Sequence, residues 1–442
     1  MMLSTFRHGV QSLRVGVTAL LALVLLAGCI GQEESEGQGF TPLDLAQVPT
    51  GTPPTPVGTP ANTGVGGVTG VLPPTSAKTL DAAQLVTLQP NELGVVPVLM
   101  YHAFVTNPTD DEWTRTLGDF QNDLQWLYDN DYYIVTMREL LDNAISAPPG
   151  KHPVVLTFDD ASARQFQFEK NAKGDLVPTA DSAVGVMEAF FAKHPDFGHT
   201  SFFALLPFNC FSFEDVEYNT IDYCEEKLTW LADHGYEIGN HTWGHQDLSQ
   251  ANADEVISQI GQTMDFIDER VEGPANMSRV LVLPYGAIPD PEVDWWAWSA
   301  VYEGFVWNDE VIELEGVVNV TGGVMTSPAS TEWNPLAISR FNTEPSQIDY
   351  WFGALVDGTL TPYTSDGNPQ TVVVPSDEHD LLAEEFDPDM LELAGKTALI
   401  YDPKSGDLGV VHQSSDSVAQ TRADGFTAWH RNRESAYDLV LR

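Results

Sequence analysis

Two adjacent carboxylates and two histidines have the residue types and spacing of a metal-dependent hydrolytic site. Asp159 and Asp160 are neighbours, and His241 and His245 are separated by three residues. Two imidazoles at this spacing can face the same way if the segment turns helically, and one carboxylate completes a three-ligand site with an open position for water. Such a metal lowers the pKa of its water and polarises a carbonyl oxygen. Adjacent carboxylates repel each other unless one is neutralised, which would leave the second carboxylate free as a general base.

Each of these groups follows a short apolar run of the kind that forms a buried strand. The runs cover residues 95–101, 154–158, 236–239 and 280–283, and polar residues follow each of them: His102, Asp159 with Asp160, Asn240 with His241, and the segment 284–286. Segments with apolar residues at helical spacing lie between the runs, at 120–130, 183–194 and 253–270. This alternation predicts an α/β fold with a mostly parallel sheet or barrel. In that architecture functional groups gather at the carboxyl ends of the strands.

Each piece has a plainer interpretation when taken alone. Two aspartates after a strand are often a turn or a helix cap. Two histidines on a loop are often only solvated side chains. His102 is either an active-site residue or a histidine satisfied within a strand end. Because the two aspartates and the two histidines follow separate expected strands, their occurrence together favours a metal site.

Three of these motifs, in chain order, resemble those of a known enzyme family. Thr157-Phe158-Asp159-Asp160, His241-Thr242-Trp243-Gly244-His245 and Pro284-Tyr285-Gly286 are similar to the first three motifs of the polysaccharide deacetylases, the NodB-homology group also called carbohydrate esterase family 4. The resemblance covers about residues 93–345. It implies a distorted (β/α) barrel with fewer than eight regular strands. We expect residues 346–442 to add a C-terminal extension that completes the barrel and ends in a small β-rich appendage.

The resemblance also implies roles for individual residues. The ligands of a divalent metal would be Asp160, His241 and His245, with zinc favoured over cobalt, nickel or iron. Asp159 would be the catalytic base. The backbone amide of Tyr285 would help to stabilise the oxyanion, and Pro284 and Tyr285 would border the substrate. Trp243, inside the two-histidine motif, could stack on a sugar ring.

The chain departs from the family pattern at two places. The third motif of the family usually has an arginine two residues before the proline, where it orients the base, and this chain has Val282 there. Arg340, in the stretch 338–341, follows another expected strand and is predicted to replace that arginine from a different direction. The family's last motif supplies a histidine general acid, and residues 305–345 hold no convincing match to it. His102 or water would then protonate the leaving group.

The N-terminus has the pattern of an export signal. Residues 1–28 contain two arginines, an apolar stretch and small residues at positions 27 and 28. With Cys29 they resemble a bacterial lipobox, so Cys29 is expected to carry a lipid; a free thiol after an ordinary secretory signal is the alternative. Residues 29–92, rich in Gly, Pro and Thr, are interpreted as a disordered tether. We therefore expect an exported protein that faces outward and attaches to the cell membrane or envelope only through this lipid.

The remaining cysteines and the charge narrow the function further. Cys210 and Cys224 are expected to close a disulfide, with two free thiols as the alternative. The chain has 20 basic and 64 acidic residues and a formal charge of −44. This charge argues against nucleic-acid binding and against electrostatic attachment to a membrane. Residues 165–178 are expected to form a β-hairpin.

Three functions remain open at this point. The first is an envelope deacetylase that hydrolyses N-acetyl groups of a polysaccharide containing N-acetylglucosamine. The second is an esterase that removes O-acetyl groups, as from xylan, because both reactions pass through the same kind of oxyanion. The third is a carbohydrate-binding lipoprotein without turnover, which Val282 and the missing terminal histidine suggest.

Overall fold

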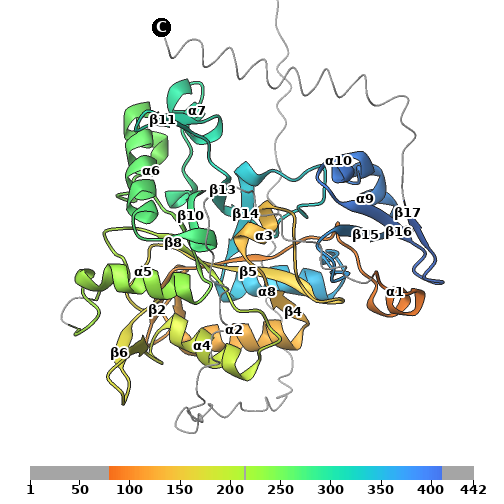
Figure 1. Cartoon of the computed structure of the whole chain (residues 1–442), viewed down its shortest axis with the longest axis horizontal. Helices are drawn as coiled ribbons and strands as arrows, with labels where there is room; N and C mark the ends of the chain where they lie inside the picture. The colour runs from red at the N-terminus through yellow and green to blue at the C-terminus, as the bar shows by residue number, and fades with distance from the viewer. Residues whose placement is uncertain (1–78, 214–215, 411–442) are drawn as a thin grey trace, which may run out of the picture. The chain divides into compact units, whose positions relative to one another are not determined.

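A computed structural model describes residues 79–213 and 216–410 of the chain (Figure 1). The expected signal peptide at 1–28, Cys29 and residues 30–78 of the expected tether lie outside the described residues, as do residues 411–442. Within the described ranges, no helix combines the length and the apolar character needed to cross a membrane.

Seven parallel strands close into a barrel. Their order around the ring is β1, β14, β13, β10, β9, β8 and β5, and β1 closes the ring by pairing with both β14 and β5. An eighth strand, β4, pairs with the first residues of β5. The bounds are β1 Val98–Tyr101, β4 Tyr132–Ile134, β5 His152–Phe158, β8 Phe202–Leu205, β9 Glu237–Asn240, β10 Asn276–Val282, β13 Gly316–Gly322 and β14 Ile338–Asn342. The prediction of a distorted (β/α) barrel with fewer than eight regular strands is confirmed.

The strands are buried on both faces, which is why the sequence shows continuous apolar runs. One face fills the barrel interior, where Val98, Val155 and Ile338 belong to the same apolar cluster. The other face packs under the outer helices, where Leu99 and Leu156 share a second cluster with residues of α2, α4 and α5. Successive residues of a strand therefore alternate between the interior and the helical layer.

The helices of the outer layer follow the expected periodicity. Their bounds are α2 Leu117–Asp129, α3 Met137–Leu141, α4 Ala183–Lys193, α5 Cys224–Asp233, α6 Ala253–Asp268, α7 Trp295–Tyr302 and α8 Pro345–Val356. The predictions of helices near 120–130, 183–194 and 253–270 are confirmed by α2, α4 and α6. In α6, Asn252 and Glu255 form a capping box, and the buried face includes Val256 and Ile260.

Short strand pairs decorate the barrel. The expected hairpin is present, because β6 Phe168–Lys170 pairs antiparallel with β7 Leu176–Pro178. The strands β2 Ala103–Val105 and β3 Thr114–Thr116 form a parallel ribbon directly after β1. The strands β11 Phe305–Trp307 and β12 Glu310–Ile312 form a further antiparallel pair.

The end of the described chain forms a second, smaller sheet. It contains β15 Thr371–Pro375, β16 Thr397–Tyr401 and β17 Leu408–Val410, with helices α9 His379–Glu384 and α10 Pro388–Leu393 between its first two strands. Before this sheet, α8 begins at Pro345 and packs Phe352 and Leu355 into the barrel core. The segment after residue 345 therefore first completes the barrel and then forms the small β-rich appendage, as expected.

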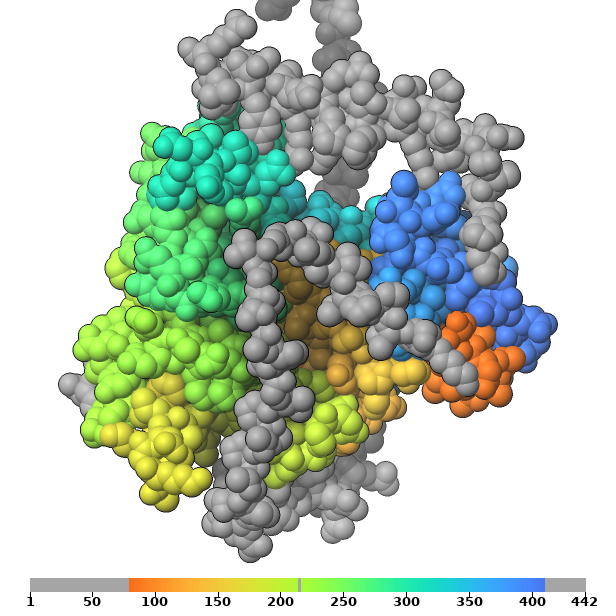
Figure 2. Space-filling model, viewed as in Figure 1, coloured from red at the N-terminus to blue at the C-terminus, as the bar shows by residue number. Residues whose placement is uncertain are grey.

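The expected tether ends earlier than residue 92. Residues Ala82–Leu88 form helix α1, which Asp81 and Gln84 begin with a capping box. Leu85 is buried and packs, together with Leu80, against Val373 and Leu399 of the small sheet. Figure 2 shows α1 in orange beside this sheet in blue. The prediction that residues 82–92 are disordered was wrong. It did not allow for leucines such as Leu85, which become buried against the small sheet.

Candidate active site and metal centre

Side-chain alternation brings the expected site residues to the barrel interior. Val155 of β5 faces inward, so positions 157 and 159 face inward as well. The same alternation from Val98 and Ile338 directs His102 and Arg340 inward. Because parallel strands all end at the same mouth of the barrel, these side chains meet there.

Asp159 and Arg340 form a buried ion pair at this mouth. Both side chains are fully buried, and Arg340 donates from its two terminal nitrogens to the two carboxylate oxygens of Asp159, each at 2.7 Å. Arg340 also donates to Thr157 Oγ1 at 2.8 Å and, through Nε, to the carbonyl oxygen of Asn319 at 2.7 Å. The predicted contact between Arg340 and Asp159 is therefore present. Val282, which stands where the family has its arginine, is buried in the interior cluster.

The ion pair fixes the charge state of Asp159. Burial by itself would raise the pKa of the Asp159 carboxyl, but the charge and hydrogen bonds of Arg340 lower the pKa well below its ordinary value. Asp159 is therefore a carboxylate at neutral pH. Its Oδ2 lies 3.7 Å from Nε2 of His102. Burial lowers the pKa of His102, although the nearby carboxylates Asp159 and Asp160 act in the opposite direction.

Asp160, His241 and His245 converge beside this pair. Asp160 Oδ1 lies 3.3 Å from Nε2 of His241 and 3.3 Å from Nε2 of His245. The three candidate ligand atoms all lie within 4.8 Å of one another. The structure therefore brings together the three residues that the sequence predicted as metal ligands.

The donor atoms fit a divalent transition metal. Nδ1 of His241 lies 2.9 Å from the carbonyl oxygen of Val282, so this nitrogen carries the proton and Nε2 holds the free lone pair. This Nε2 is buried and has no hydrogen-bond partner among the described groups. A buried lone pair without a partner is costly, and a metal ion would satisfy it. Two imidazoles and one carboxylate form a donor set of the kind that zinc uses in hydrolytic sites.

The segment that carries the two histidines is a loop, so a helical turn is not what brings the two imidazoles together. Thr242 and His245 have left-handed backbone angles, with φ of 62° and 52°. Gln259 of α6 holds the loop: its carbonyl oxygen accepts from the Trp243 N–H at 2.9 Å, and its side-chain oxygen accepts from the Gly244 N–H at 2.7 Å. In a helical turn the N–H groups of Trp243 and Gly244 would point along the helix axis, whereas here both donate to Gln259.

The turn that carries Asp160 is strained and is held by the loop of the disulfide. Asp160 and Ala161 have φ of 71° and 47°, a conformation that costs an ordinary residue about 1–2 kcal/mol. Asn209 Nδ2 donates to the carbonyl oxygen of Asp160 at 2.9 Å, and the Phe211 N–H donates to that of Ala161 at 2.6 Å. The residue between these donors is Cys210, which forms the expected disulfide with Cys224. The disulfide loop therefore supports the position of a candidate ligand.

Replacing both Cys210 and Cys224 by serine is expected to lower the free energy of unfolding by about 3 kcal/mol, because the bridge closes a short loop across 14 residues. Zinc affinity should fall as well, since the Asp160 turn loses part of its support. Urea unfolding and zinc titration of the double variant measure the two effects. A lower stability with unchanged zinc affinity would contradict the positioning role of the loop.

Aromatic side chains surround the candidate centre. Tyr285 lies in the short helical turn Pro284–Gly286, is 68% exposed, and has its ring centroid 4.5 Å from that of His245. Trp243 is half-buried and contacts the rings of Phe208 and Phe266, with centroids at 5.5 and 5.9 Å. Its ring is engaged in packing, which does not support the expectation that it stacks on a sugar. Phe208 belongs to the same group of rings and is 64% exposed, so its ring is open to solvent.

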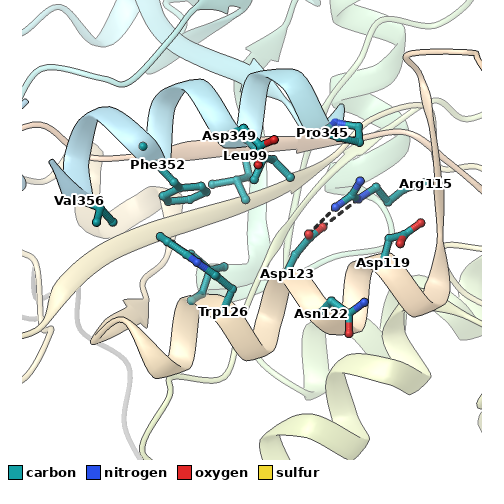
Figure 3. A pocket seen from close by; sticks show the side chains of 13 residues that line it. Leu99, Arg115, Asp119, Asn122, Asp123, Trp126, Pro345, Asp349, Phe352 and Val356 are labelled. Carbon is teal, nitrogen blue, oxygen red and sulfur yellow. Dashed lines mark hydrogen bonds and ion pairs between the residues drawn. The ribbon is translucent and has the colours of Figure 1, made fainter. Parts of the chain in front are cut away.

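A separate groove lies on the outside of the barrel between α2 and α8 (Figure 3). It has a volume of about 560 Å³ and contains an ion pair between Arg115 and Asp123. Tyr101 O–H donates to the same carboxylate at 3.2 Å. Because none of the predicted site residues lines this groove, it is distinct from the candidate active site.

Comparisons with known proteins agree with this class of site. Residues 206–294, which include both histidines and the Pro284–Gly286 turn, match the family model described as polysaccharide deacetylase. The chain is 21% identical over 265 residues to the polysaccharide-deacetylase-like protein YxkH of Bacillus subtilis, covering 59% of this chain and 76% of that protein. It is 25% identical over 219 residues to the peptidoglycan-N-acetylglucosamine deacetylase of Bacillus cereus, covering 45% of this chain and 65% of that enzyme.

Among solved structures, the chain is similar to the Streptococcus pyogenes deacetylase PplD in complex with acetate. The sequence identity is 18% and the TM-score is 0.39, with 58% of this chain and 97% of that chain covered. The family match and the curated relatives therefore support a polysaccharide deacetylase domain of the NodB type.

Proposed function

We propose that the protein is a metal-dependent deacetylase that hydrolyses N-acetyl groups of an envelope polysaccharide containing N-acetylglucosamine. The observation that carries this proposal is the convergence of a buried, arginine-paired carboxylate, Asp159, with the three candidate ligands at one mouth of the barrel. The match to a peptidoglycan-N-acetylglucosamine deacetylase supports the choice of an N-acetyl substrate.

The residues that would hold the metal are Asp160, His241 and His245. We propose zinc, because two neutral imidazoles and one carboxylate are typical of its catalytic sites. A divalent cation in this position would act as a Lewis acid toward a carbonyl oxygen and would acidify a water molecule.

The chain's own groups provide the proton transfers. Asp159 is ionised and is kept in one orientation by Arg340, so it can take a proton from the attacking water. Asp159 would pass this proton to Nε2 of His102 across the 3.7 Å gap from its Oδ2, and His102 would then deliver it to the leaving nitrogen. Tyr285 lies in the tight turn Pro284–Gly286 with a left-handed φ of 59°, and its backbone N–H would donate to the oxyanion.

We propose in addition that the protein is exported and is anchored through a lipid on Cys29. The signal-like pattern of residues 1–28 supports export. The Cys210–Cys224 disulfide supports it too, because such bonds persist in oxidising compartments. Mass analysis of the N-terminal peptide from membranes tests the lipid; an unmodified Cys29 would contradict it.

Acetate release by the full chain, purified in detergent, tests the deacetylase. We expect release from N-acetylglucosamine oligomers that a chelator abolishes and zinc restores. Asp159→Asn should reduce the rate about 10²–10⁴-fold, because it removes the general base. Acetylated xylan is the comparison substrate, and faster release from xylan would favour an O-acetyl esterase. If the Asn variant releases acetate as fast as the wild type, the proposed site is wrong.

A further inference from the structure

Trp113 is an exposed aromatic residue beside the candidate active site, and the sequence patterns did not single it out. Its side chain is 39% exposed, and its ring centroid lies 4.8 Å from that of His102, with the two rings inclined at 64°. The edge-on contact leaves part of the indole surface open to solvent next to a group that we assign to proton transfer.

The backbone around Trp113 is held from several directions. The Ala103 N–H donates to the Trp113 carbonyl oxygen at 3.1 Å, and Asn342 Nδ2 donates to the Glu112 carbonyl oxygen at 3.0 Å. The Trp113 N–H itself donates to Asp111 Oδ1 at 3.1 Å. The indole is therefore placed before any ligand arrives, which reduces the entropy that binding would cost.

The ribbon that carries Trp113 is also fastened to the barrel. Arg115, two residues further along β3, donates to both carboxylate oxygens of Asp123 on α2, at 3.0 and 2.5 Å. Figure 3 shows this pair. The ribbon therefore holds Trp113 in place while part of its apolar surface remains in water.

Two exposed aromatic side chains each contact a histidine at the mouth of the barrel. Trp113 touches His102, which lies 3.7 Å from Asp159. Tyr285 touches His245, which lies 3.3 Å from Asp160. A sugar chain that places its acetyl group at the adjacent aspartates would therefore have exposed aromatic rings within reach.

We propose that Trp113 forms a pyranose-binding subsite for the sugar next to the reacting one. This inference rests on the proposed deacetylase function. Sugar rings present C–H faces that pack on an indole, and a wide aromatic surface is a frequent source of binding energy in interfaces. The subsite would hold the sugar that neighbours the reacting one on the His102 side.

The test compares the full-length wild type with Trp113→Ala, Trp113→Phe and Tyr350→Ala. Tyr350 is 65% exposed on α8 and is the matched control for loss of a surface aromatic ring. Two substrates are used: a β-1,4-linked N-acetylglucosamine tetramer and 4-nitrophenyl acetate, which has no sugar. Binding of the tetramer is also measured calorimetrically in the Asp159→Asn background, so the subsite is tested without turnover.

We expect Trp113→Ala to lower kcat/KM for the tetramer about tenfold more than for the ester, mainly through KM, as loss of an aromatic anchor would. Tetramer binding should weaken about tenfold as well. Trp113→Phe should retain part of the activity on the tetramer and part of the tetramer binding. Tyr350→Ala should change neither the activity nor the binding. Equal losses on both substrates would mean that Trp113 only shields His102, and would overturn the inference.

The two proposals fail in different ways. A wild type that binds the tetramer through Trp113 but releases no acetate would contradict the deacetylase and retain the subsite. A wild type that releases acetate and binds the tetramer independently of Trp113 would contradict the subsite only. A wild type that does not bind the tetramer would overturn the subsite.

Discussion

Replacing Arg340 by methionine is expected to lower the free energy of unfolding by about 3–5 kcal/mol, because it leaves the Asp159 carboxylate buried without a cation. Both side chains are fully buried, and methionine fills much of the same space without replacing the donors to the carboxylate. Turnover should also be lost, since the base is no longer oriented. Urea unfolding of the metal-free protein and acetate release measure the two effects.

The pH dependence identifies the cause of this loss. In the wild type, Arg340 keeps the folded pKa of Asp159 below its ordinary value, so the ion pair stabilises the fold above about pH 4 and is lost below it. In the methionine variant the effects of Arg340 are absent, and burial, the largest influence on the pKa of Asp159, outweighs the nearby His102 and His241 and raises the folded pKa. Its stability should therefore decline as pH rises from about 4, so that its deficit against the wild type is largest near neutral pH.

The double variant Asp159→Asn with Arg340→Met is the control for this experiment. It removes the buried charge together with its partner, so most of the stability should return while turnover stays absent. If the double variant is as unstable as Arg340→Met alone, the loss comes from packing, and the charge argument is wrong.

Replacing His245 by alanine is expected to weaken zinc binding by more than about 100-fold, which exceeds the usual effect of removing a hydrogen-bond partner of a ligand. His245 is suited to this test because its side chain is 24% exposed, so the fold should persist. A competition titration with a chromophoric chelator measures the affinity. In the wild type, zinc at 100 times its Kd should add about 2.7 kcal/mol to the stability.

His199 provides the matched control for the zinc experiment. Its Nε2 lies 2.8 Å from Glu188 Oε1, so it is also a histidine next to a carboxylate, but it is 47% exposed and lies outside the cluster of three ligands. His199→Ala should leave zinc affinity unchanged. Equal weakening in both variants would show that the measured zinc is bound elsewhere.

The barrel and the position of its site could be predicted from the sequence because buried strands leave a clear pattern of apolar runs. The runs before His102 and Asp159 are apolar because both faces of these strands are covered, and the residues at their ends lie at the mouth of the barrel. The contact between Arg340 and Asp159 could be predicted as well, because a buried base needs a cation and Val282 supplies none.

The remaining features depend on contacts that no local pattern contains. The loop from His241 to His245 is shaped by Gln259, on a helix that follows it. Helix α1 is stabilised by leucines that pack on Val373 and Leu399, nearly at the other end of the described chain. Trp113 reaches His102 only because the parallel ribbon β2–β3 folds back on the strand end.

The closing strand of the barrel determines when this site can be assembled. In chain order β14 is the last strand of the ring, but it lies between β13 and β1, and Phe341 pairs with Leu99 across almost the whole domain. Contacts this distant in sequence form late, especially in a chain that is synthesised from its N-terminus. Since β14 also carries Arg340, the cation reaches Asp159 together with the strand that closes the ring. A nascent or truncated chain that ends before residue 338 therefore has neither the closed barrel nor the paired base, and hydrolytic activity reports the completion of folding.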